Sequence, residues 1–573
     1  MLYDSVKNIG GIQSSAEFKN EETLSGVDPV SGGTQESKEG VSAVYEAKSQ
    51  LINEYLQTEQ VVQVVILDRV TGLSPVDLHR IGFGRYQWQL FVLTGLGWAA
   101  DDIWLQGVAI ILPQIENELR PVRVEYATMA LYAGLILGAS TWGVLADLIG
   151  RRLSFNITLF IAGVFGIAAG GANNFTTLAA LIACLGFGVG GNLPVDGAIF
   201  LENIPQSHQW LLTLLSVWWA LGQLLASLIA WPLIGNFSCA SATDCTKADN
   251  MGWRYNFYTL GAITFLMWFL RYFVFNLQES PKYLLAKGRD EDALKVLEHI
   301  ARVNGKVLSL TLDQLQTVSG EKRATGVPMS NLQIIKQSFS SFTLSHVKPL
   351  FSTRRLAINT SITIALWGLI GLAYPLFNGF ITLYLTTHIS DASSSVSTTY
   401  RNYVIISILG IPGSVIACLV VDWYRKDHSE KSMRDDRSGT RFLIGGRKLT
   451  MAVSTALTGI FLFLFTTSTK EADVLAYSCV TSLTQNAMYG VLYAYTPEVF
   501  PAPHRGTGDA LCSAFNRMTG ILAPAIKIVT TPVSGGASQT TANGPIFVAA
   551  SLFLVSAILM MLLPIETAGK AAL

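Results

Sequence analysis

Long apolar runs fill the chain from about residue 89 to residue 563, and polar or Gly/Pro-rich breaks separate them. A helix needs about 20 mostly apolar residues to cross the hydrocarbon core of a bilayer, and the runs approach or reach that length. The pattern therefore predicts twelve transmembrane helices, near residues 89–112, 126–146, 153–172, 178–200, 211–235, 254–275, 357–387, 402–422, 449–467, 474–496, 507–532 and 546–563.

A long polar stretch divides these runs into two sets of six, so we expect an all-α membrane protein with two pseudo-symmetric six-helix bundles. Within the polar stretch, apolar residues at helical spacing over 290–304 predict one soluble helix. In the polar tail, a short amphipathic helix could form over 61–70. The expected domains are a disordered cytoplasmic tail (1–75), an N-terminal bundle (76–275), a cytoplasmic linker with short helices (276–356) and a C-terminal bundle (357–573) with a cytoplasmic insertion at 423–446.

The loops that follow the even-numbered runs are rich in Lys and Arg, and the opposite loops are poor in them. Because short cytoplasmic loops are enriched in these residues, both termini are expected to be cytoplasmic, in the plasma membrane or an endomembrane. Cys239 and Cys245 share a loop on the opposite side, where they could form a disulfide. The other four cysteines lie in apolar runs and are expected to pack as small hydrophobic residues.

Composition excludes several classes of function. The formal net charge is zero, which gives nucleic-acid binding no electrostatic support. There is no metal-binding Cys/His spacing, P-loop or nucleophile elbow. We therefore expect no enzyme activity, no metal and no cofactor, and a monomer whose partners are the lipid bilayer, protons and a small-molecule substrate.

Asp101 and Asp102 lie near the middle of the first apolar run. A carboxylate at that depth is costly, and it usually faces a water-filled path, a partner or a proton. Burial favours the protonated form and neighbouring carboxylates repel each other, so such a pair can bind and release protons. The alternative is a helix-packing site that transports nothing.

A repeated motif marks both halves. The segment from Gly143 through Asp147 to Gly150, Arg151 and Arg152 has a counterpart in 413–422 followed by 446–448, and the Glu-x-x-Pro at 202–205 has one at 498–501. Glycines permit tight turns and close helix approach, and Asp and Arg at helix ends can form a charge network. The residues expected to close the cytoplasmic mouth are Gly143, Asp147, Gly150, Arg151, Arg152, Glu202, Glu279, Asp422, Arg447, Glu498 and Arg505.

These motifs resemble those of the major facilitator superfamily. The segments 278–284 and 564–570 are similar to two signatures of its sugar-porter group, and 82–88, 98–101 and 190–196 are similar to the branch related to synaptic vesicle proteins. The resemblance covers about 82–570. The chain departs from the family's pattern at two places. Ser207–Trp210 stands where the family often has an arginine of the inner gate, and Trp104 stands where animal relatives carry a second acidic residue.

The resemblance implies a central cavity between the halves, and the matching runs carry polar or aromatic residues at helical spacing. Arg517 lies deep in the eleventh run, where an arginine needs an anion. That anion is either a protein carboxylate such as Asp509 or a group of the substrate. The candidate cavity residues are Gln106, Asn192, Asp196, Gln223, Trp367, Tyr374, Asn378, Asn486, Tyr489, Tyr493 and Arg517.

The function expected from these observations is secondary active transport by alternating access. Symport of protons, bound at Asp101 or Asp102, with a small polar or anionic organic solute fits best. The resemblance implies a sugar-like solute, and Arg517 leaves an organic acid open. The alternatives are a proton-driven exporter and a non-transporting nutrient sensor, which would need a large cytoplasmic domain.

Overall fold

The structure is a computed structural model. It describes residues 84–204, 211–243, 245–275, 277–286, 288–306, 308, 310–317, 347–388, 395–421, 446–468, 470–500, 505–530 and 543–567, all within one compact unit, Ala47–Leu573. The expected tail, its short helix at 61–70 and nearly all of the expected insertion at 423–446 lie outside the described residues.

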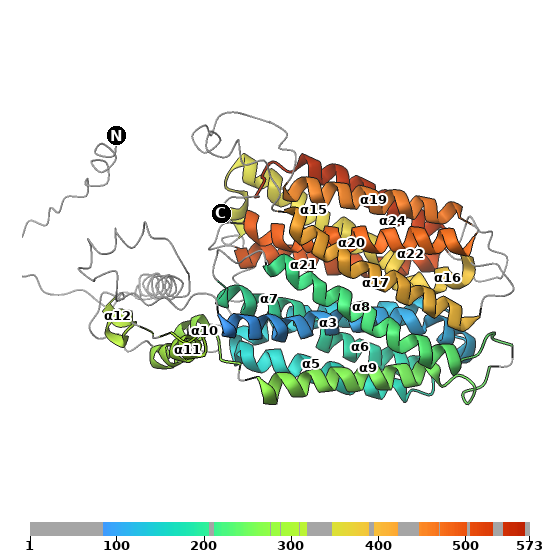
Figure 1. Cartoon of the computed structure of the whole chain (residues 1–573), viewed down its shortest axis with the longest axis horizontal. Coiled ribbons are helices and arrows are strands. Elements are labelled where there is room, and N and C mark those ends of the chain that lie inside the picture. Colours follow the sequence, from blue (N-terminus) through green and yellow to red (C-terminus); the bar gives the residue numbers. More distant parts are fainter. Residues whose placement is uncertain are drawn as a thin grey trace, which may run out of the picture. The chain divides into compact units, whose positions relative to one another are not determined.

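The first half of the chain forms a helical bundle in which α3 packs on α8, α4 on α6, and α5 on α9. Figure 1 shows these helices in blue to green. The elements are α3 (Arg85–Leu119), α4 (Glu125–Ile149), α5 (Arg151–Gly170), α6 (Phe175–Val189), α7 (Asn192–Asn203), α8 (Leu211–Asn236), α9 (Gly252–Phe269) and the π-helical turn η2 (Leu270–Val274).

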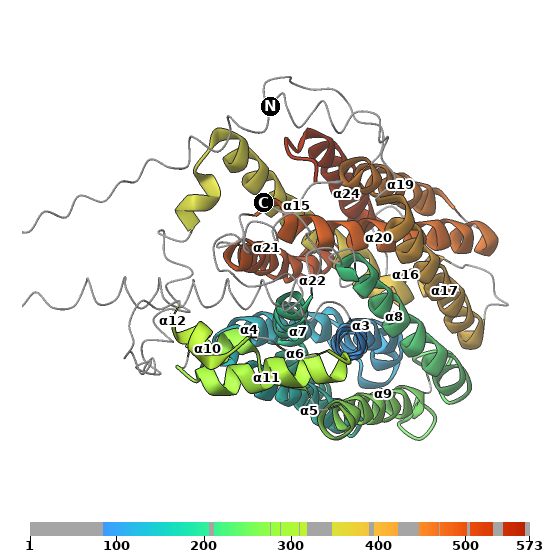
Figure 2. The same cartoon turned by 60° about the vertical axis from the view of Figure 1, so that its left-hand side comes forward.

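The second half forms a bundle in which α15 packs on α21, α17 on α20, and α19 on α24. Figure 2 shows these yellow-to-red helices beside the first bundle, which they meet mainly where α17 and α20 contact α8. The elements are η3 (Lys348–Phe351), α15 (Arg354–Phe377), η4 (Asn378–Phe380), α16 (Ile381–His388), α17 (Val396–Val421), α19 (Arg447–Thr467), α20 (Glu471–Val499), α21 (Arg505–Gly520), α22 (Leu522–Thr530) and α24 (Gly544–Leu562).

Within the described residues, six helices are long and apolar enough to cross a membrane. They are Arg151–Gly170, Thr213–Asn236, Arg354–Thr386, Val396–Val421, Arg447–Thr467 and Gly544–Leu562. The remaining long helices are interrupted or carry more polar residues, and α3 is an example because both Asp101 and Asp102 lie inside it.

Some runs expected to be continuous helices are broken. The run 178–200 divides into α6 and α7 at Gly190 and Gly191, where an added Cβ would come within 2.5 Å of the Leu135 carbonyl oxygen and 2.6 Å of the Trp142 ring. Only glycine permits this close approach to α4. The run 507–532 likewise divides into α21 and α22, and the run 254–275 ends in the π-helical turn η2.

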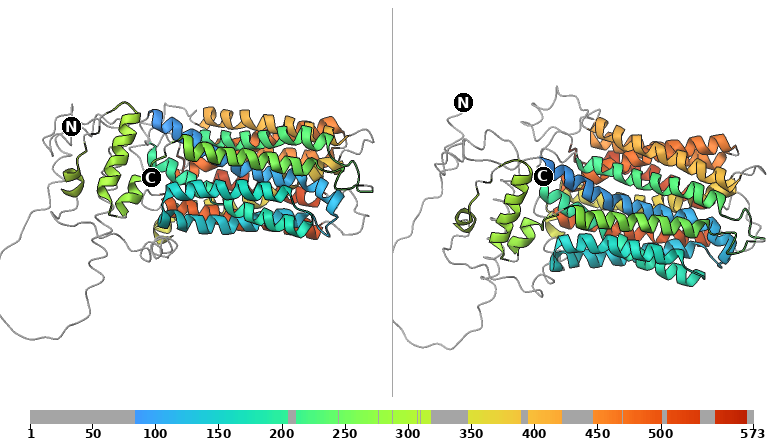
Figure 3. Two further views of the ribbon diagram at one scale, coloured as in Figure 1. Left: turned by 90° about the horizontal axis from the view of Figure 1, so that it is seen from below. Right: turned by 60° about the horizontal axis from the view of Figure 1, so that its bottom comes forward.

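The linker helices α10 (Pro281–Ala286), α11 (Asp290–Val303) and α12 (Leu312–Thr317) lie at one end of the helices, which we call the linker end. The loop between α8 and α9 lies at the other end, which we call the disulfide end (Figures 1 and 3). The predicted linker helix is confirmed as α11, whose apolar face is buried.

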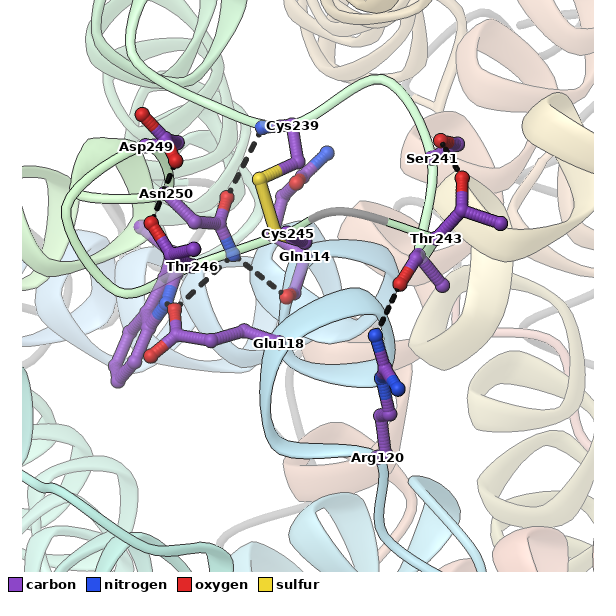
Figure 4. The surroundings of a disulfide bond; sticks show 12 residues. Gln114, Glu118, Arg120, Cys239, Ser241, Thr243, Cys245, Thr246, Asp249 and Asn250 are labelled. Atoms are coloured by element: carbon purple, nitrogen blue, oxygen red, sulfur yellow. Dashed lines mark hydrogen bonds between the residues drawn. A yellow bond between two sulfur atoms is a disulfide. The ribbon is translucent and has the colours of Figure 1, made fainter.

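A disulfide joins Cys239 and Cys245, as the sequence suggested (Figure 4). Next to it, the Asn250 side chain accepts a hydrogen bond from the Cys239 amide at 3.3 Å and donates to the Gln114 carbonyl at 2.9 Å and to Glu118 at 3.1 Å. The loop is thereby fixed to the end of α3.

Glu118 is the centre of a buried ion pair at this end of the first bundle. Its carboxylate oxygens accept two hydrogen bonds from Arg254, at 2.7 and 2.8 Å, and one from Trp253 at 2.9 Å. The side chains of Arg254 and Glu118 are 2% and 6% exposed. The pair therefore joins α3 to α9.

We expect Glu118→Ala to destabilise the fold by about 3–5 kcal/mol, because it leaves Arg254 buried without its counter-ion. The measurement is the melting temperature of the purified protein, followed by tryptophan fluorescence. The control is Asp292→Ala, which removes an acid from an exposed pair with Arg289 and should leave the melting temperature unchanged. Equal melting temperatures for Glu118→Ala and the unmodified protein would contradict the prediction.

Candidate functional site

The candidate site is centred on three polar residues in the middle of α3. Asp101, Asp102 and Gln106 are 2%, 2% and 1% exposed. Gln106 follows Asp102 by one helical turn, so the two side chains are neighbours on the helix surface. The Gln106 amide donates a hydrogen bond to Asp102 at 3.2 Å, and this contact fixes the orientation of the carboxylate.

Gln106 also connects the two halves of the molecule. Its amide nitrogen donates to the Tyr374 hydroxyl of α15 at 2.9 Å, and its amide oxygen accepts from the Tyr403 hydroxyl of α17 at 2.5 Å. Gln223 of α8 donates to the same Tyr403 hydroxyl at 3.5 Å. Gln106 thus links the Asp102 carboxylate of the first half, through hydrogen bonds, to hydroxyl groups of the second half.

An aromatic cluster surrounds this network. Trp98 and Trp219 come from the first half, and Trp367, Tyr374, Tyr489 and Tyr493 from the second. The ring of Trp219 lies 5.4 Å from that of Tyr489 and 5.7 Å from that of Tyr493, and the ring of Trp98 lies 4.9 Å from that of Tyr493. Such rings pack well against flat or apolar parts of a ligand.

Several buried polar atoms at this interface have no hydrogen-bond partner among the described residues: one carboxylate oxygen of Asp101 and the indole N–H groups of Trp98 and Trp219. The Trp219 indole lies beside Asp102 without reaching hydrogen-bonding geometry. Because unsatisfied buried polar atoms are costly, these groups are suited to a polar ligand or water.

Arg517 of α21 lies within electrostatic range of Asp101, Tyr132 and Tyr493. It is 7% exposed. Within the part of the chain that the structure describes, its guanidinium makes no ion pair or hydrogen bond. The proposed partner Asp509 is not paired with it there, so a buried cation is available beside the carboxylates.

A small cavity adjoins the network, with Gln106, Tyr132, Tyr374 and Asn378 in its wall. Its volume is about 10 Å³, which is room for about one water molecule. This cavity therefore leaves little free space beside the network.

Among the described residues, several hydrogen bonds join the first bundle to the second. All of them lie either at the level of Gln106 or closer to the disulfide end. Thr382 donates to the Ala109 carbonyl at 2.5 Å, Tyr400 donates to the Ile110 carbonyl at 2.9 Å, and the Trp231 indole donates to Ser397 at 3.2 Å. Lys527 lies 4.1 Å from the Tyr384 ring at the same end and within electrostatic range of Glu116 and Glu125. The disulfide end is closed by these contacts.

Of the other predicted cavity residues, Asn378 lines the small cavity beside the network, and the rest lie elsewhere. Asn378 donates to Gln485 at 2.9 Å within the second half, and Asn486 packs against Gly410 of α17. Asn192 and Asp196 are fully buried in the first half, where Asp196 is paired with Arg271 at 2.8 Å. The predicted cavity residues outside this group come together at or beside the interface between the halves. They are Gln106, Gln223, Trp367, Tyr374, Tyr489, Tyr493 and Arg517.

At the linker end, the repeated motifs form matching helix caps. Gly150 has a φ of 104° and leads into α5, whose first amides, those of Arg151 and Arg152, donate to Glu279 at 3.0 and 3.3 Å. A carboxylate is favourable at this position because a helix N-terminus carries partial positive charge.

The second half repeats this cap. Gly446 has a φ of 88°, and the amides of Arg447 and Lys448 donate to Glu566 at 3.1 and 3.2 Å. The Arg447 guanidinium also pairs with Glu498 at 2.5 Å. Gly143 lies within α4, whereas the side chains of Asp147, Glu202 and Arg505, and all of Asp422, lie outside the described residues.

Residues of these networks that were not singled out in the sequence include Arg271, Tyr403, Lys527 and Glu566. Arg271 and Lys527 could have been found by the rule that drew attention to Arg517, since each is a cation within a predicted span. Glu566 lies in a quoted signature. Tyr403 carries no distinguishing signal in the sequence.

Comparisons with known proteins agree with this arrangement. Residues 90–431 match the family model "Major Facilitator Superfamily". The chain is 46% identical over 500 residues to "MFS siderochrome iron transporter 1" of Ceriporiopsis subvermispora, covering 87% of this chain and 90% of the relative. It is 24% identical over 513 residues to a synaptic vesicle 2-related protein of Rattus norvegicus, covering 86% and 81%.

The solved proton:xylose symporter XylE has the same fold, with a TM-score of 0.59 and 15% identity, covering 85% of this chain and 98% of the symporter. The expected resemblance, including its branch, is confirmed. The chain belongs to the Major Facilitator Superfamily of transporters, and it is therefore an integral multi-pass membrane protein rather than an enzyme.

Proposed function

We propose that this transporter is a proton-coupled symporter in which Asp101 and Asp102 bind the coupling protons. Two bundles of six spans each would rock around the central site, so that the site opens alternately to either side. The linker end would face the cytoplasm, since it carries Arg151, Arg152, Arg447 and Lys448. The disulfide at the opposite end supports this orientation, because disulfides persist in oxidising compartments.

The observation that carries the proposal is the network from Asp102 through Gln106 to Tyr374 and Tyr403. An ionised Asp102 accepts the Gln106 amide hydrogen, whereas a protonated Asp102 also has a hydrogen to donate. Protonation therefore changes the hydrogen bonds available to the residue that joins the halves. A change at this point favours one arrangement of the halves over the other, as coupling requires.

The solute would be a small polar or anionic organic molecule. Arg517 can bind a carboxylate through two parallel hydrogen bonds, and the unpartnered indole N–H groups can donate to further oxygens. The relative is named for siderochromes and the symporter for xylose. Since these cargoes differ, the chemistry of Arg517 and the aromatic cluster is the better guide to the solute class.

The test is uptake into proteoliposomes with a panel of radiolabelled monocarboxylates, pentoses and hexoses. We expect at least one solute to accumulate above its outside concentration when an inward proton gradient is imposed, and the accumulation to vanish with a protonophore. Protein-free liposomes are the control. If every accepted solute only equilibrates whatever the gradient, the chain is a facilitator and the proposed coupling is wrong.

A further inference from the structure

A second charged group lies inside the first bundle, apart from the interface. The Arg271 guanidinium donates to Asp196 at 2.8 Å, to the Phe155 carbonyl at 2.9 Å and to the Leu93 carbonyl at 2.9 Å. It also lies 3.3 Å from the Phe155 ring centre. Both charged side chains are 0% exposed. Arg271 thus contacts α3, α5 and α7 at once, and it does so from the π-helical turn η2, a feature that is frequent at functional sites.

The Asp196 carboxylate lies directly against α3, one turn before Asp101. A Cβ added to Gly97 would come within 1.7 Å of the Asp196 oxygen that binds Arg271, so only glycine leaves room for it. Gly97 and Asp101 are separated by one turn on the same face of α3, a rise of about 5.4–6 Å. Among the described residues, the charged groups facing Asp196 are Arg271 of η2 and Asp101 of α3.

Unsatisfied polar atoms lie on both helices that carry the two carboxylates, α3 and α7. One oxygen of Asp101, the other oxygen of Asp196 and both amide atoms of Asn192 are buried without hydrogen-bond partners. Asn192 precedes Asp196 by one turn of α7. Because α7 runs antiparallel to α3, as the contact of Asn203 with Gln87 shows, Asn192 lies at about the depth of Asp101. Polar atoms left open in this way can hold a water molecule that conducts protons.

Residues next to Arg271 line a cavity at the linker end. This cavity has a volume of about 240 Å³, which is room for several water molecules. Leu93, whose carbonyl binds Arg271, and Phe275, which follows η2, both line it, together with Tyr86 and His299. Leu93 therefore connects the surroundings of Arg271 to this cavity at the linker end.

We propose that Asp196 is a second proton acceptor, which takes the proton from Asp101 and passes it to water in the linker-end cavity. The inference rests on the proposed function and extends it. The proton leaves the Asp101 carboxyl, which becomes a carboxylate, and protonates Asp196, which loses its ion pair with Arg271. Arg271 then favours release of the proton, since release restores the pair. Proton and solute would thus leave the central site by different routes.

The transport test uses Asp196→Asn, which keeps an oxygen for Arg271 and cannot carry the proton. With a solute accepted in the uptake screen, we expect exchange of labelled for unlabelled solute to persist and accumulation driven by the proton gradient to disappear. Asp292→Asn, on the exposed linker, is the matched control and should accumulate solute normally. Normal accumulation by Asp196→Asn would overturn the relay.

The outcomes separate the two proposals. If Asp101→Asn is uncoupled and Asp196→Asn is not, the relay is wrong and the central coupling site stands. If the unmodified protein shows no coupling, the proposed function itself is wrong.

A second measurement needs no solute, and its comparison with Arg271→Lys applies even where Asp196→Asn fails to fold. Infrared spectra of the purified full chain in lipid, recorded against pH, should contain a protonated-carboxyl band that is absent from Asp196→Asn and whose midpoint shifts in Arg271→Lys. A protonated-carboxyl band with the same midpoint in the unmodified protein and in Arg271→Lys would belong to a group that does not respond to Arg271, and it would overturn the inference.

Discussion

Asp101→Asn should abolish accumulation of solute against its gradient while leaving equilibration across the membrane intact. Each pH unit of inward gradient supplies about 1.4 kcal/mol, enough for about tenfold accumulation at one proton per solute. Asparagine fills the same space as aspartate but binds no proton at neutral pH, so this driving force is lost. The accumulation ratio is then expected to fall from about ten to about one.

The measurement is the steady-state ratio of solute inside to outside in proteoliposomes at an imposed gradient of one pH unit. Asp292→Asn is the control for the chemical change itself. Hydrogen bonds from Arg289 and Lys295 hold the pKa of Asp292 below its usual range, so that carboxylate stays ionised at the assay pH and should not couple transport. If Asp101→Asn still concentrates solute tenfold, the coupling proton binds elsewhere.

Much of the architecture could be predicted from the chain because it depends on local patterns. Runs of apolar residues predict helices, and the linker helix was identified by its helical spacing over 290–304, close to the observed Asp290–Val303. The two Gly/Arg turns were identified because both halves repeat them. The glycines there adopt positive φ angles at 150 and 446, which other residues rarely do.

The interruptions of the helices were harder to predict. Gly190 and Gly191 lie inside an apolar run, and glycine within such a run is compatible with a continuous helix. At these glycines the chain lies so close to α4 that a side chain would clash with the Leu135 carbonyl and the Trp142 ring. Such contacts depend on the packing of distant segments and leave no periodic signal in the sequence.

The choice of partners among buried charged residues also could not be predicted. The sequence placed Asp196 with the candidate cavity residues, and it left Arg517 with a choice between Asp509 and a substrate. In the structure Arg271 takes Asp196 as its partner, and Arg517 lies near Asp101. Pairing of this kind is set by which helix faces meet, and composition and spacing constrain only the residue types.

Arg517→Gln should weaken binding of a monocarboxylate solute by about 30-fold or more, since losing one partner of a buried charge pair costs about 2–5 kcal/mol. Glutamine keeps hydrogen-bond donors but removes the positive charge. A neutral sugar, if accepted, should bind the variant with little change. The measurement is the solute concentration that half-saturates exchange, determined for both solute classes.

Arg517→Lys separates the charge from the geometry of the guanidinium. Lysine keeps the positive charge but lacks the planar fork that binds a carboxylate through two hydrogen bonds. An intermediate loss for the monocarboxylate, between the unmodified protein and Arg517→Gln, would show that both the charge and the fork contribute. If Arg517→Gln impairs the sugar and the monocarboxylate equally, Arg517 balances Asp101 within the protein and does not bind the solute.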